Sequence, residues 1–87
     1  MRLTQNELAQ VFAQKYSGRY FFASRKWYDR ETMKAVPESE IVGLCVALAH
    51  RLEVDYGRAW PGSIGFIKGA MGFLKHDPRM MLSSDES

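Results

Sequence analysis

Residues 19–36 interrupt the helical periodicity of the chain, and this interruption most constrains the fold. Three short runs follow one another here: the aromatic segment 19–23, Trp27-Tyr28, and Met33-Lys34-Ala35-Val36, separated by polar turns at 24–26 and 29–32. Aromatic and β-branched runs bounded by polar turns predict a three-stranded antiparallel meander. Because three strands are stable only when one face packs on another element, the sheet needs helices beside it.

A helix is predicted before the sheet, over residues 5–16. Thr4 and Glu7 have the spacing of a capping box, in which each side chain binds the backbone N–H of the other residue. We expect Gly18 to end the helix in the left-handed conformation that glycine tolerates.

Two helices are predicted after the sheet. Pro37 and the acids that follow it favour a helix start, and the apolar pattern runs to about Val54. Ser63 is expected to cap the third helix, which the Asp77-Pro78 step ends. The sequence therefore predicts an α+β fold of order α-β-β-β-α-α, with a single domain over 1–82 and a polar tail over 83–87.

Composition narrows the classes of function. The chain has 87 residues and a net charge of +2, which permits nucleic-acid contact without requiring it. A single cysteine, Cys45, allows no internal disulfide and favours a cytoplasmic protein. No signal peptide and no apolar run that could span a membrane is present. No phosphate-binding glycine loop and no set of metal ligands is present, so we expect neither cofactor nor metal.

A basic and aromatic cluster in the meander is the first candidate site. Its members are Arg19, Arg25, Lys26, Arg30 and Lys34, together with Trp27 and Tyr28. Cations interleaved with aromatic rings suit a phosphate backbone and stacked bases. The alternative is an ordinary amphipathic sheet, with aromatic residues on the core face and charges on the solvent face. The sequence leaves both interpretations open.

A glycine-rich helix face is the second candidate site. Gly65, Gly69 and Gly72 fall within the third predicted helix, and Tyr56 and Trp60 precede it. Each glycine costs a helix roughly 1 kcal/mol relative to alanine, so a face of them predicts close approach of another backbone. This face is expected to pack tightly on the second helix or on a partner, and with Tyr56 and Trp60 it could form a docking groove.

The pairs of residues that could act in catalysis each have a simpler structural interpretation. Cys45 and His50 are five residues apart, but a buried apolar cysteine is the simpler interpretation. Asp29 and Glu31 share a predicted turn that is open to water. We therefore predict that the chain itself is not an enzyme.

Several short motifs, in their order along the chain, resemble those of a known family, and the resemblance covers nearly the whole chain. The motifs are Glu7-Leu8-Ala9, Gly18-Arg19-Tyr20, Lys26-Trp27-Tyr28-Asp29, Ser63-Ile64 and His76-Asp77-Pro78-Arg79. Together they resemble the domain just ahead of the helicase module in phage and plasmid primase–helicases, shared with the poxvirus primase–helicase. Met33 stands where that family often has tryptophan, and the helicase motifs are absent.

The resemblance implies a non-catalytic accessory domain for DNA replication that aids DNA engagement or subunit assembly. Its implied partners are DNA, a helicase or ATPase module and further copies of itself. A protein–protein interaction module that binds no nucleic acid is the alternative. Both an excised domain and a free-standing protein of a mobile element are compatible with the resemblance.

Overall fold

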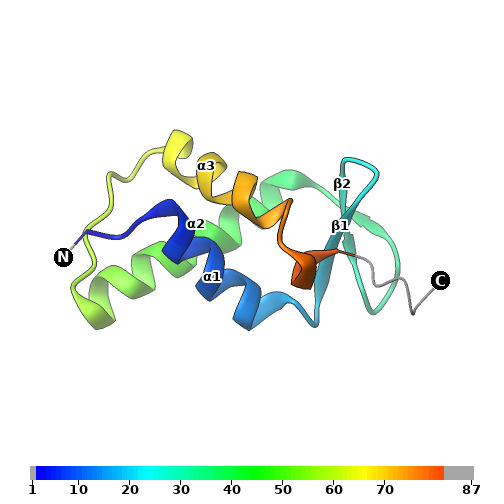
Figure 1. Cartoon of the computed structure of the whole chain (residues 1–87), viewed down its shortest axis with the longest axis horizontal. Coiled ribbons are helices and arrows are strands. Elements are labelled where there is room, and N and C mark those ends of the chain that lie inside the picture. The colour runs from blue at the N-terminus through cyan, green and yellow to red at the C-terminus, as the bar shows by residue number, and fades with distance from the viewer. Residues whose placement is uncertain (1, 82–87) are drawn as a thin grey trace.

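The order of elements along the chain is the predicted one, α-β-β-β-α-α. The computed structural model describes residues 2–81, with helices on one side and the sheet at one end (Figure 1). The elements are α1 (Gln5–Tyr16), β1 (Tyr20–Ala23), β2 (Lys26–Asp29), β3 (Ala35–Val36), α2 (Glu38–Tyr56), α3 (Ile64–Leu74) and the short 3-10 helix η1 (Pro78–Met80). The α+β prediction is confirmed, whereas the predicted tail 83–87 lies outside the described residues.

Helix α1 begins as the sequence predicts and ends differently. The Thr4 hydroxyl accepts the Glu7 backbone N–H at 3.0 Å, and the Glu7 carboxylate accepts the Thr4 N–H at 3.5 Å. The helix ends at Tyr16, and the cap residue Ser17 keeps a right-handed conformation. Gly18 does not adopt a positive φ, so its predicted left-handed role is wrong. The chain instead turns into β1 through a hydrogen bond from the Arg19 N–H to the Tyr16 carbonyl.

The β1–β2 hairpin closes over a two-residue turn. Ser24 and Arg25 have φ values of 52° and 65°, as a type I′ turn requires. Lys26, predicted as part of this turn, is the first residue of β2 and pairs with Ala23.

The third strand is shorter than predicted because Met33 has a φ of 59° and belongs to the preceding turn. Asp29 shapes that turn: its carboxylate accepts the N–H groups of Glu31 at 2.8 Å and Thr32 at 3.3 Å. Only Ala35 and Val36 pair with β2.

The sheet has two faces of different character. Trp27 pairs with Phe22 and Val36, and this face packs on the helical core. Phe21 pairs with Tyr28 on the opposite face, with ring centroids 5.2 Å apart. Because side chains alternate along a strand, Lys26 lies on the same face as Tyr28. We call the side that carries Phe21, Lys26 and Tyr28 the outer face.

The core lies between the three helices and the inner face of the sheet. Its fully buried side chains are Leu8, Phe12, Ile41, Cys45, Ile67, Met71, Leu74 and Met80. Helix α2 runs two residues beyond the predicted Val54 to Tyr56, and Gly57, with a φ of 65°, caps its end. Helix α3 begins at the predicted cap, where the Ser63 hydroxyl accepts the Phe66 N–H, but it stops at Leu74, before the Asp77-Pro78 step. None of the described helices is long and apolar enough to cross a membrane.

Candidate nucleic-acid interface

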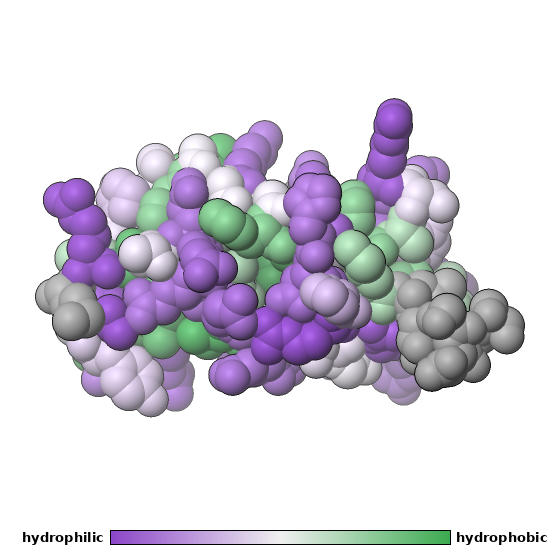
Figure 2. Space-filling model, viewed as in Figure 1, coloured by the Kyte–Doolittle hydropathy of each residue, from purple (hydrophilic) through white to green (hydrophobic). Residues whose placement is uncertain are grey.

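The tip of the β1–β2 hairpin presents two cations to solvent. Arg25 occupies the second position of the turn, and Lys26 follows it on the outer face of β2. Both side chains are exposed, and neither forms an ion pair with any other described residue. Figure 2 shows hydrophilic side chains projecting at this end of the molecule. The hairpin tip is therefore an open cationic surface.

Two further cations lie at the other end of the sheet. Lys34 is exposed next to the β2–β3 turn, where its carbonyl accepts the Asp29 backbone N–H at 2.9 Å. Arg19 is also exposed, and its guanidinium lies over the Tyr20 ring, 5.7 Å from the centroid. Lys34 forms no ion pair within residues 2–81.

Nearby carboxylates neutralise little of this charge. Asp29 uses one oxygen for the backbone N–H groups of its own turn. The Glu40 carboxylate accepts a hydrogen bond from the Tyr20 hydroxyl at 3.1 Å. The pKa of Tyr20 is raised mainly by burial of the phenol and also by this hydrogen bond. Glu31 is exposed, and its carboxylate has no ion-pair partner among the described residues.

Arg30 donates hydrogen bonds to backbone carbonyls of two distant segments. Its Nε donates to the Ser17 carbonyl at 2.7 Å, and Nη2 donates to the carbonyls of Met81 at 3.0 Å and Arg79 at 3.3 Å. Its guanidinium also lies over the Phe21 ring at 5.2 Å. Arg30 thus ties the end of α1 to the segment after η1, so its donors are largely committed.

The two predicted stacking residues have different environments. Trp27 is only 2% exposed and packs against Phe22 at 5.1 Å, so its ring cannot stack on a base without unfolding the sheet. Tyr28 is half-buried on the outer face, stacked on Phe21. Only Tyr28 therefore remains a candidate for base stacking.

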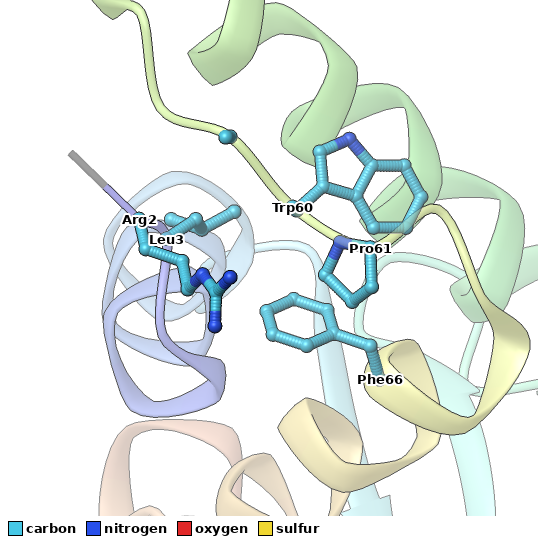
Figure 3. Close-up of a pocket in the computed structure, with 6 residues that line it drawn as sticks. Arg2, Leu3, Trp60, Pro61 and Phe66 are labelled. Carbon is cyan, nitrogen blue, oxygen red and sulfur yellow. The ribbon is translucent and has the colours of Figure 1, made fainter.

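Tyr56, Trp60 and the glycines do not share one groove. Trp60 and Phe66 line a cleft of about 340 Å³ with Arg2, Leu3 and Pro61. Figure 3 shows Arg2 and Leu3 opposite the two aromatic rings. Tyr56 is 72% exposed and lines a separate hollow beside α1.

The glycine face of α3 also differs from the prediction. A Cβ on Gly69 would overlap the side-chain amide of Gln5 in α1, so the close approach is made by α1 and not by α2. Gly65 and Gly72 have open space where a Cβ would stand. Of these three glycines, only Gly69 has a close neighbour, and that neighbour is the side chain of Gln5 rather than another backbone.

Cys45 and His50 lie in different environments on α2. Burial raises the pKa of the Cys45 thiol to about 12, so it carries almost no thiolate near neutrality. His50 is exposed on α2 while Cys45 is buried, which keeps the two side chains apart. Within residues 2–81, no group of three or more histidine, cysteine, aspartate or glutamate side chains could hold a metal ion.

One residue beside the hairpin escaped the sequence analysis. Lys75, just after α3, lies over the Phe22 ring at 5.3 Å and pairs with Glu38 at 3.5 Å. No local pattern links position 75 to a hairpin some fifty positions earlier. Its place depends on how α3 packs.

In comparisons with known proteins, no family model, no curated protein and no solved structure matches the chain.

Proposed function

We propose that this chain is a non-catalytic accessory domain of a phage- or plasmid-type DNA replication primase–helicase, and that it contacts DNA through its sheet. The contact surface consists of Arg25, Lys26 and Lys34, with Tyr28 available for stacking. Arg19 extends this surface at the far end of β1.

The exposure of unpaired cations around one small sheet carries this proposal. Arg51, Arg58 and Arg79 each have a carboxylate partner elsewhere in the molecule, whereas Arg25, Lys26 and Lys34 have none within residues 2–81. Displacing counterions from DNA favours binding of such cations. Three phosphate contacts predict that the logarithm of affinity falls with the logarithm of salt with a slope of about −2 to −3.

Fluorescence anisotropy of labelled single-stranded and duplex DNA over a series of salt concentrations tests the proposal. Each of Arg25→Asn, Lys26→Gln and Lys34→Gln should reduce the slope by about 0.7–0.9. Asparagine is chosen at position 25 because it tolerates the left-handed φ of 65° found there. Lys68→Gln, on the exposed side of α3, is the matched control and should leave the slope unchanged.

Absence of binding at low salt would refute the DNA contact. An equal loss of slope in Lys68→Gln and the hairpin variants would show non-specific attraction to net charge. Either result would exclude this surface as the DNA-binding site.

The alternative function is protein docking at the other end of the molecule. The apolar Trp60–Phe66 cleft and the exposed side chains of Val54 and Tyr56 favour it. Sedimentation over a concentration series should then show self-association that Tyr56→Ser weakens. A monomer at all concentrations would exclude association between copies of this chain.

A further inference from the structure

The free edge of β1 can accept a further strand. β1 is an outermost strand of the sheet, because the strand order is β1-β2-β3. Within residues 2–81, only Met81 pairs with this edge, through a parallel bridge to Phe22. The backbone N–H and C=O groups of an edge strand are a template for an added strand. The part of the edge that leads from Phe22 to the hairpin tip is therefore available for pairing.

Met81 meets this edge in a fixed position and direction. Arg30 holds it there, because Nη2 donates to the Met81 carbonyl at 3.0 Å while Nε donates to the Ser17 carbonyl at 2.7 Å. Met81 has the extended conformation of a strand, with a φ of −101° and a ψ of 157°. Because its bridge to Phe22 is parallel, the backbone direction at Met81 points along β1 towards Arg25 and the hairpin tip.

The sequence that follows Met81 matches the hairpin tip in length and charge. Asp85 and Glu86 follow Met81 by four and five positions, and Arg25 lies three positions beyond the bridge. An extended chain rises about 3.3 Å per residue, so four residues span about 13 Å and three span about 10 Å. The two carboxylates can therefore reach Arg25 and Lys26, which have no ion-pair partner within residues 2–81.

From these observations we infer that residues 82–86, which we call the acidic segment, dock along the free edge of β1. Asp85 and Glu86 then pair with Arg25 and Lys26, the cations that the proposed function assigns to DNA. Exposed ion pairs are weak, so a DNA strand can displace the acidic segment. The inference deepens the proposed function as a regulation of the same surface, and it rests on that function for the competition with DNA but not for the contact itself.

Paramagnetic broadening in NMR spectra locates the acidic segment without DNA. A nitroxide label is attached to Ser87→Cys, while the native Cys45 is buried and stays unlabelled. Tyr20 and Ser24 lie two positions on either side of the bridged residue Phe22. A segment without a preferred direction would broaden the amide signals of both alike. We expect Ser24 to broaden more than Tyr20.

Charge removal tests the ion pairs within this contact. Asp85→Asn with Glu86→Gln should weaken the broadening at Ser24, and so should 1 M salt, at which the screening length is about 3 Å. Arg25→Asn with Lys26→Gln should have the same effect, because it removes the other partner of each pair. Broadening at Ser24 that none of these changes reduces would refute the pairing.

Fluorescence anisotropy measures the competition with DNA. Asp85→Asn with Glu86→Gln should raise the affinity for DNA about two- to fivefold, as expected when two cations are freed from exposed ion pairs. Glu53→Gln with Asp55→Asn is the matched control, since it removes the same charge from exposed positions near the end of α2. This control should change the affinity less, because it lies at the opposite end of the molecule from the hairpin.

The outcomes distinguish the contact from the proposed function. If the label broadens Ser24 in a charge-dependent way but DNA does not bind, the contact is right and the proposed function is wrong. If DNA binds but the label broadens Tyr20 and Ser24 equally, the contact is wrong and the hairpin surface stands. An equal gain in DNA affinity from the acidic-segment variant and its control would overturn the regulation.

Discussion

Replacing Gly72 by alanine should stabilise the chain. Gly72 lies in α3, its φ is not positive, and an added Cβ would meet no atom within 4 Å. Alanine is favoured over glycine in a helix by about 0.5–1 kcal/mol. For a domain of this size, such a gain raises the melting temperature by roughly 2–8 °C.

The same substitution at two other glycines should give different results. At Gly69 the new methyl group would displace the Gln5 side chain, whose Nε2 donates to the Phe66 carbonyl at a long 3.4 Å. Because Gln5 can rotate away, we expect the gain in helix propensity to be largely offset. At Gly57, with a φ of 65°, alanine should destabilise by about 1–2 kcal/mol.

Thermal unfolding followed by circular dichroism at low protein concentration measures all three variants. The expected order of stability is Gly72→Ala, then Gly69→Ala, then Gly57→Ala. A clear destabilisation by Gly72→Ala would refute the reasoning, because it would mean that something fills the space beside α3. A concentration-dependent melting temperature that Gly72→Ala abolishes would identify a second copy of the chain as the occupant.

Three further predictions concern the core and the sheet. Arg30→Gln should lower the free energy of unfolding in urea by about 1–3 kcal/mol, because hydrogen bonds from a charged group are lost; weaker DNA binding at unchanged stability would instead assign Arg30 a phosphate contact. The Cys45 thiol should react with a thiol reagent only as the chain unfolds, since burial raises its pKa to about 12; fast labelling of the folded chain would contradict this. In the unfolded chain the Cys45 thiol has its ordinary pKa of 9.0. The free energy of unfolding should therefore not depend on this thiol below pH 9, and it should fall as the pH rises toward 12. Cys45→Ala should reduce this fall, measured by urea titrations at several pH values.

Local interactions explain which parts of the fold could be predicted. The cap of α1 depends on Thr4 and Glu7, which lie in one turn, so the sequence alone predicts it. The cap of α3 is local in the same way, since the Ser63 hydroxyl binds the Phe66 N–H. The third strand could not be placed as well. Met33 takes a left-handed conformation that the neighbouring Asp29-stabilised turn imposes, and methionine itself gives no sign of it.

The candidate site could be predicted only in part, for the same reason. Arg25 and Lys26 lie in a hairpin whose residues are adjacent in sequence, and the sequence identified both. Which face of β2 is buried depends on the helices that cover it, so the sequence could not show that Trp27 is inside and Tyr28 outside. The acceptors of Arg30 and the position of Lys75 come from distant segments, and only tertiary packing brings them to the sheet.

The geometry also makes the two candidate functions separable. The molecule is 41 Å long and about 20 Å across, and the hairpin lies at the opposite end from the loop between α2 and α3 (Figure 1). A charge removed at Lys26 is therefore well beyond the screening length of about 8 Å from the Trp60 cleft. We expect Lys26→Gln to weaken DNA binding without changing self-association, and Tyr56→Ser to do the reverse. If either variant changed both properties, DNA binding and association would be coupled, and DNA would have to bind an assembly of several copies rather than a single chain.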